Sequence, residues 1–227
     1  SALSLGDITD IRISNNIIRR TSPNAYNASG IYFDKGSAFR IWNNIIYDMG
    51  QGTGSFASTG IRQYATNANF YVYNNTVINA YYGYRFNPDY TTFVSKNNIA
   101  QDCTDGFYGD YGSFNSSSDY NISDLSADTT GGSHDKAGTS LIFAEAGDDD
   151  YHLSDRDGMA IGTGTDLSSD SSLAFTTDID LETRSGLWCI GADEKNTLYR
   201  SVGTNTANLN TASATVTISG TTATFSV

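Results

Sequence analysis

Four side chains that suit recognition of sugars recur at matching positions of a repeated motif. Each stands two residues after a glycine: Tyr32, Arg62, Arg85 and Tyr108. Two residues further on come Asp34, Tyr64, Asn87 and Asp110. Tyrosine rings pack on the faces of sugar rings, and guanidinium groups bind hydroxyls or carboxylates. The pattern predicts a carbohydrate-binding surface; the alternative is a solvated sheet face on which the arginines pair with Asp34 or Asp110.

The same residues leave open whether the chain is an enzyme. A polysaccharide lyase needs a base, often Arg or Lys beside a calcium site, and a glycoside hydrolase needs two carboxylates about 5–9.5 Å apart. Asp34 and Asp110 lie three repeats apart, about 14 Å at the spacing of stacked strands. That distance is too long for the pair alone, so neither catalytic pattern is complete.

Other chemically capable residues have simpler explanations. An acidic cluster offers oxygen ligands for Ca²⁺ but fits no EF-hand, and we expect it to be a solvated turn: Asp148, Asp149, Asp150, Asp155 and Asp157. No cofactor is otherwise expected, and no metal-ligand set is identified. His134 and His152 lack a nucleophile partner, so we expect them to be structural or solvated. A further aromatic set forms either a second sugar platform or ordinary packing: Trp42, Tyr71, Tyr73, Tyr81 and Tyr82.

The elements that must position these residues come from two interleaved repeats. The first is an Asn-Asn pair between short apolar segments, at 15–16, 43–44, 74–75 and 97–98. The second is a glycine followed by an apolar residue, at 30–31, 60–61, 83–84 and 106–107. The first three glycines each precede the next Asn pair by 13 or 14 residues. A spacing this regular indicates a repeat architecture in which each unit adds one coil to a stack.

Stacking of coils explains why these residue types recur. Side chains alternate along a strand, so Ile31, Ile61, Tyr84 and Phe107 lie on one side while the Tyr and Arg positions lie on the other. Aligned coils turn the apolar positions into internal columns and the asparagines into hydrogen-bonded ladders. Asparagine tolerates the left-handed conformation of a sharp turn, and we expect the glycines to mark a backbone bend.

With these motifs the chain resembles the right-handed parallel β-helix, or pectin-lyase-like, superfamily of secreted bacterial repeat proteins. The resemblance covers roughly residues 5–195. It includes terminal segments Asp150–Leu153, Ala160–Gly164 and Ile190–Glu194, although Gly158-Met159 stands where relatives usually carry Ser-Pro. It implies an all-β solenoid with an asparagine ladder. In this superfamily the sheet whose strands begin at the repeated glycines commonly lines a substrate groove. The superfamily includes lyases, hydrolases, phage tailspikes, adhesins and inert stalks, so it implies no single activity.

Composition narrows the partners. The net charge is −12, with 13 basic and 25 acidic residues, which disfavours nucleic acid and anionic membranes. No apolar run approaches the length of a membrane span, and no secretion signal is visible, so we expect a piece cut from a longer precursor. The two cysteines, Cys103 and Cys189, are expected to be buried free thiols, with one disulfide as the alternative.

The chain is predicted to have two parts. Residues 1–195 form the β-helix, with a polar excursion at 124–149 and closing coils at 150–195. Residues 196–227 form the second part. Within it, segments 214–219 and 223–227 alternate around Gly220-Thr221-Thr222, which predicts a β-hairpin that is a cap, a linker or the start of a following module. The leading hypothesis is a rigid extracellular or cell-surface module that binds a polysaccharide or glycan. The alternatives are a polysaccharide lyase or glycoside hydrolase, and a phage tail-fibre or adhesin segment; the oligomeric state is left open.

Overall fold

The computed structural model describes residues 9–21, 28–33, 36–50, 57–64, 68–87, 92–110 and 112–195, together with the backbone of two strands near the end of the chain. The chain divides into two compact units, Ser1–Lys195 and Asn196–Val227. In the second unit, β16 (Thr215–Ser219) and β17 (Thr222–Ser226) pair antiparallel, which confirms the predicted hairpin. Its role as cap, linker or module stays a prediction.

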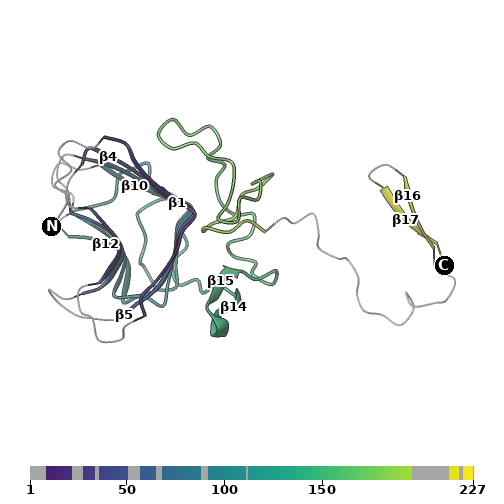
Figure 1. Cartoon of the computed structure of the whole chain (residues 1–227), viewed down its shortest axis with the longest axis horizontal. Helices are drawn as coiled ribbons and strands as arrows, with labels where there is room; N and C mark the ends of the chain where they lie inside the picture. Colours follow the sequence, from purple (N-terminus) through teal and green to yellow (C-terminus); the bar gives the residue numbers. More distant parts are fainter. Residues whose placement is uncertain are drawn as a thin grey trace. The chain divides into compact units, whose positions relative to one another are not determined.

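The first unit is a stack of coils whose strands form three parallel sheets (Figure 1). Sheet A contains β1 (Ile11–Ser14), β4 (Ala38–Trp42), β7 (Asn69–Tyr73) and β10 (Thr92–Lys96). Sheet B contains β2 (Ile17–Arg19), β5 (Ile45–Gly50), β8 (Thr76–Ala80), β11 (Ile99–Gln101) and β13 (Ile122–Ser123). Sheet C contains β3 (Ser29–Phe33), β6 (Thr59–Gln63), β9 (Tyr82–Phe86) and β12 (Asp105–Gly109). The chain visits sheets A, B and C in turn, which confirms the predicted parallel β-helix.

The interior of the stack is filled by aligned apolar columns. Phe39, Phe70 and Phe93 on sheet A stack with ring centroids 4.3 and 5.9 Å apart and planes within 12° of parallel. On sheet C the predicted row Ile31, Ile61, Tyr84 and Phe107 is in register and buried. Because no strand of five residues can bury such a row alone, each coil depends on its neighbours for its core.

The second asparagine of each pair forms the ladder between sheets A and B. Side-chain amides link Asn16 to Asn44, Asn44 to Asn75 and Asn75 to Asn98 at 2.9–3.1 Å. A fifth rung, Asn121, accepts from Asn98 at 3.3 Å. The first asparagines have φ between 50° and 58°, and Tyr120 takes that position before Asn121 with φ 61°. The ladder is therefore confirmed and extends one rung beyond the Asn-Asn motif.

The repeated glycines have a different cause from the predicted backbone bend. None of Gly30, Gly60, Gly83 and Gly106 has a positive φ. A Cβ on Gly60 would lie 2.7 Å from the carbonyl oxygen of Gly83, and one on Gly83 would lie 2.6 Å from that of Gly106. Glycine is required because the next coil approaches too closely for a side chain.

Residues 124–139 are an ordered end to the stack rather than a loose excursion. Asp128 accepts hydrogen bonds from the backbone N–H groups of Gly106 and Phe107, at the edge of β12. Asp135 accepts from the backbone and the side-chain amide of Asn121, the last rung of the ladder. Two carboxylates thus satisfy the donors that a further coil would have used, which protects the edge from pairing with other chains.

Residues 140–195 do not add closing coils, in contrast to the prediction. They contain only two short antiparallel strands, β14 (Phe143–Glu145) and β15 (Asp150–Leu153), joined by a 3-10 turn, η2 (Ala146–Asp148). The rest lies along the outside of sheets A and B, and we call 140–195 the covering segment. No helix in the described part of the chain is both long and apolar enough to span a membrane.

The covering segment is held by the first asparagine of each pair. Their side-chain amides donate to its backbone carbonyls: Asn15 to Ile179, Asn43 to Thr177, Asn74 to Cys189 and Gly191, and Asn97 to Thr165. Arg184 is fully buried there, 2.9 Å from Glu194, and donates to Asn43 Oδ1 at 3.0 Å. The second asparagine of each pair therefore joins the coils to each other, and the first joins the coils to the covering segment. One first asparagine also links two coils, since the Asn97 amide donates to Asn74 Oδ1 at 3.1 Å.

Candidate functional site

The outer face of sheet C differs from those of sheets A and B. The described residues of the covering segment pack on outward apolar side chains of sheet B, such as Ile45 and Tyr47, and of sheet A, such as Trp42 and Tyr73. Neither of these clusters includes a residue of sheet C. On sheet C, Tyr32 remains 47% exposed, and Tyr64, just after β6, remains 48% exposed.

The four predicted Tyr and Arg positions lie on neighbouring strands of sheet C. The register pairs Tyr32 with Arg62, Arg62 with Arg85, and Arg85 with Tyr108. The row therefore crosses β3, β6, β9 and β12 over about 14 Å, three strand spacings. A flat β face that presents rings and guanidinium groups at this spacing can hold an extended chain of sugars.

The first half of the row, the Arg62 cluster, consists of Tyr32, Arg62 and Tyr64. The Arg62 guanidinium lies 5.6 Å from the centroid of each ring. The two rings are 6.5 Å apart and inclined at 35°. Within the described part of the chain Arg62 has no ion pair, and its buried Nε has no hydrogen-bond partner. Its contacts are those of a cation beside two aromatic rings.

The second half, the Arg85 cluster, consists of Tyr82, Arg85, Tyr108 and Asp110. Arg85 grips the Asp110 carboxylate with Nε at 3.1 Å from both oxygens and Nη2 at 2.6 Å from Oδ1. Burial acts to lower the pKa of Arg85, but the hydrogen bond and charge of Asp110 raise it overall. Tyr82 and Tyr108 stack at 4.5 Å, with the guanidinium 4.7 and 5.7 Å from their centroids. The alternative explanation of this face, in which the arginines pair with acidic residues, therefore holds for Arg85 and Asp110.

The remaining predicted members of the face stand as follows. Asp34 lies outside the described residues. The backbone N–H of Asn87 donates to Gln63 Oε1 at 2.7 Å, at the end of β9. Tyr82 also belongs to the face, although the repeat did not predict this. It stands directly before Gly83, and that position was the feature of the sequence that could have identified it.

A carboxyl group with an unusual pKa borders the Arg85 cluster. Asp105 starts β12 and is in register with Tyr82. Burial, together with the neighbouring Asp128 carboxylate, raises the pKa of Asp105 to about 6. This carboxyl changes charge near neutral pH at one end of the face.

Asp105→Asn tests this assignment through stability. The folded-state pKa exceeds the unfolded value, so ionisation of Asp105 opposes folding as the pH rises from about 4 through 6. We expect the variant to be more stable than the parent by about 1 kcal/mol at pH 7.5, a value reduced because the group is half exposed, and equal to it at pH 4. Thermal unfolding at both pH values measures this. Asp155→Asn, the same change at an exposed carboxylate, should show no pH-dependent difference, and a similar gain there would contradict the assignment.

The other aromatic residues do not form a second open platform. Trp42, Tyr71 and Tyr73 pack against Leu167, Leu173, Phe175 and Trp188 of the covering segment. Tyr81 contacts Tyr82 edge-on at 4.7 Å, at the border of sheet C. Packing therefore accounts for the set on sheet A.

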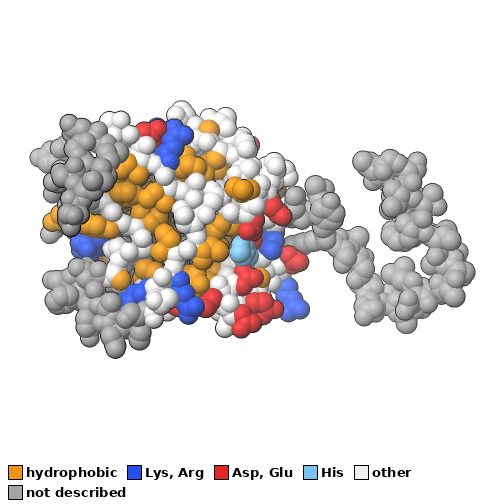
Figure 2. Space-filling model, in the orientation of Figure 1, with side chains coloured by type: hydrophobic (Ala, Val, Ile, Leu, Met, Phe, Trp, Pro, Cys, Tyr) orange, Lys and Arg blue, Asp and Glu red, His pale blue; other side chains and the backbone are white. Residues whose placement is uncertain are grey.

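The predicted acidic cluster is dispersed by the fold. Asp148 and Asp149 lie at the turn after β14, while Asp157 is buried and accepts from the backbone N–H groups of Ile142 and Ala160. A different group of carboxylate oxygens, from Asp178, Asp180 and Asp193, lies within 4.8 Å of one another. Two of these residues already accept backbone hydrogen bonds, Asp178 from Glu194 and Asp193 from Leu153. Figure 2 shows acidic side chains gathered beside β14 and β15.

Both histidines are held by carboxylates. His134 Nδ1 lies 2.7 Å from Asp119, and its ring stacks on Tyr120 at 4.4 Å. His152 Nδ1 lies 2.5 Å from Asp150 Oδ1, and the neighbouring carboxylates raise its pKa although burial acts to lower it. These contacts are structural in kind.

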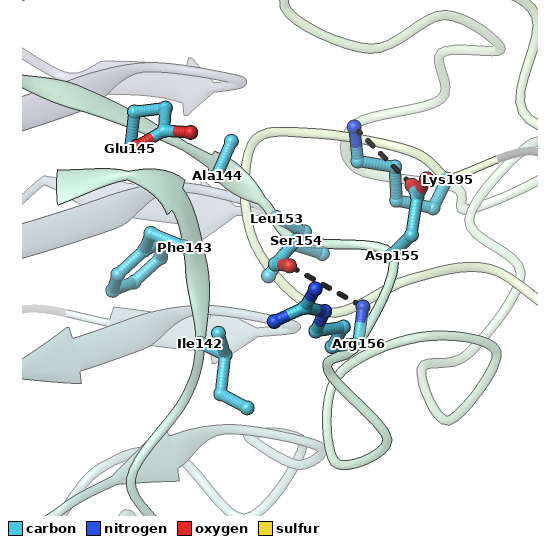
Figure 3. A pocket seen from close by; sticks show the side chains of 9 residues that line it. All are labelled: Ile142, Phe143, Ala144, Glu145, Leu153, Ser154, Asp155, Arg156 and Lys195. Carbon is cyan, nitrogen blue, oxygen red and sulfur yellow. Dashed lines mark hydrogen bonds and ion pairs between the residues drawn. The ribbon is translucent and has the colours of Figure 1, made fainter.

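A shallow hollow lies beside β14 and β15, away from the predicted residues (Figure 3). Its lining is Ile142, Phe143, Ala144, Glu145, Leu153, Ser154, Asp155, Arg156 and Lys195. Lys195 points toward Asp155 at 3.9 Å, and the Arg156 backbone N–H donates to the Ser154 hydroxyl at 3.3 Å.

Comparison of the chain with family models, with curated proteins and with solved structures finds no match.

Proposed function

We propose that this chain is a rigid module of a secreted or cell-surface protein, a right-handed β-helix of the pectin-lyase-like kind, that binds a polysaccharide through the outer face of sheet C. The single observation that carries the proposal is the in-register row of rings and guanidinium groups across four strands. The covering segment packs on sheets A and B, so this face is the one that a long ligand can reach among the described residues.

The geometry favours binding over bond cleavage. Asp110 is held by a two-pronged ion pair with Arg85, which removes both groups from the roles of general acid and base. The rings, in contrast, need no change of state to pack on sugars. We therefore propose a non-catalytic module. Incubation with plant, algal and bacterial polysaccharides should give neither unsaturated products nor new reducing ends, and steady release of either would contradict this.

Tyr32→Ala tests the binding face. Loss of one aromatic contact with a sugar ring should weaken binding about tenfold. Binding would be screened on an array of neutral and acidic glycans and then measured by calorimetry on the best ligand. Tyr71→Ala is the matched control, because Tyr71 also lies beside an arginine, Arg40 at 5.8 Å, but on sheet A. Equal losses in the two variants, or an array without any ligand, would contradict the proposal.

A further inference from the structure

The two halves of the sheet C face differ in charge although they share the same residue types. Both contain an arginine that lies within 6 Å of the centroids of two tyrosine rings. Arg85 is neutralised by Asp110, whose side chain is only 15% exposed. Arg62 has only its two rings as partners in the described part of the chain. The Arg62 cluster is therefore cationic, and the Arg85 cluster is neutral.

Acidic groups accentuate this difference. Asp105 lies beside Tyr82 at the Arg85 end, and Asp128 follows at the end of the stack. The whole chain carries a net charge of −12. A ligand with a negative charge on every sugar would place some of those charges against Asp105 and Asp110. A ligand with one negative charge would meet Arg62, which has no ion pair among the described residues, and avoid them.

We propose that Arg62 is the specificity-determining residue of this face and that it selects a glycan with an isolated carboxylate on an otherwise neutral backbone. This inference rests on the proposed function. The carboxylate would accept N–H bonds from the two terminal nitrogens of the Arg62 guanidinium, which no ion pair occupies among the described residues. Tyr32 and Tyr64 would hold the sugar that carries it, and Tyr82 and Tyr108 would hold neutral sugars.

Arg85 differs from Arg62 in already having a carboxylate partner. Arg85 has already made the two-pronged bond to Asp110 that Arg62 has available for a ligand. A carboxylate that approached Arg85 would have to displace Asp110 and leave it without its partner. The structure thus assigns ligand charge recognition to Arg62 and a packing role to Arg85.

Three sets of β-1,4-linked oligosaccharides test this inference: neutral xylo-oligosaccharides, the same chains with one glucuronic acid, and chains with a uronic acid at every position. We expect the singly charged set to bind about tenfold more tightly than the neutral set in low salt, because a charge-assisted bond is added. Arg62→Gln should remove this difference and keep the neutral affinity. Arg12→Gln, the same charge change at an exposed position on sheet A, should leave the difference intact.

Asp110→Asn provides the complementary variant. It frees Arg85, so the fully charged set should gain at least severalfold in affinity over its value with the parent protein. Equal binding of the neutral and singly charged sets, or tightest binding of the fully charged set by the parent protein, would overturn the inference and leave the proposed function standing. An equal loss for all sets in Arg62→Gln would do the same. Failure of all three sets to bind would overturn this inference, while the proposed function would still be decided by the glycan array.

Discussion

Asn75→Ala is expected to lower the free energy of unfolding of the coil stack by about 3–5 kcal/mol, because several buried polar groups lose their partners together. Asn75 is fully buried in the ladder. Its side-chain amide donates to the carbonyls of Ile41 and Tyr73 and to Asn98 Oδ1. Its side-chain oxygen accepts from the backbone N–H and from the side-chain amide of Asn44. Because Asn75 is 0% exposed, bulk solvent does not contact this rung and does not replace the bonds that alanine removes.

Denaturant unfolding followed by circular dichroism measures the loss. Asn16→Ala is the matched control, since Asn16 is the exposed end of the same ladder and, among the described residues, donates only to Ser14 and Asn44. We expect that variant to lose less than about 1 kcal/mol, as exposed hydrogen bonds are replaced by water. Similar losses at both positions would show that the ladder does not owe its stability to burial.

The coil stack could be predicted because its signals repeat in the sequence at short range. The alternation of Ile31 and Tyr32, or Ile61 and Arg62, fixes which side chains enter the core once the coils are aligned. The rung at Asn121 was missed because Tyr120 adopts the left-handed conformation that an asparagine adopts elsewhere. The glycines were assigned to the right strands for the wrong reason, since the closeness of neighbouring coils is a contact between distant parts of the chain.

The covering segment could not be predicted because its partners lie far away in sequence. Asn15 bonds to Ile179 and Asn97 to Thr165, and neither partner belongs to a repeat. The prediction that Cys103 and Cys189 are buried free thiols is confirmed. Cys189 is buried because the covering segment, to which it belongs, packs on sheet B. At the sheet C face, periodicity gave the row but could not decide between open and paired arginines. That choice depends on where a side chain such as Asp110 turns after its strand ends.

Arg184→Met is expected to destabilise the first unit by about 3–5 kcal/mol, because it leaves a buried carboxylate without its positive partner. Arg184 and Glu194 side chains are 0% and 3% exposed, and the guanidinium also binds the carbonyls of Gly191 and Ala192. Glu194 in turn accepts the backbone N–H of Cys189 at 2.9 Å. The arginine thus gathers the end of the covering segment onto Asn43 of the coils.

The two cysteines allow this loss to be located as well as measured. Burial raises the pKa of both Cys103 and Cys189 to about 12, so neither thiol should react with iodoacetamide in the parent protein. In Arg184→Met, Cys189 should become labelled while Cys103, in the coil core, stays protected; mass spectrometry distinguishes them. Arg156→Met, at an exposed arginine of the same segment, should label neither. Equal labelling of both cysteines would mean that the covering segment and the coils unfold as one unit, so that Arg184 stabilises the whole stack rather than a separable outer layer.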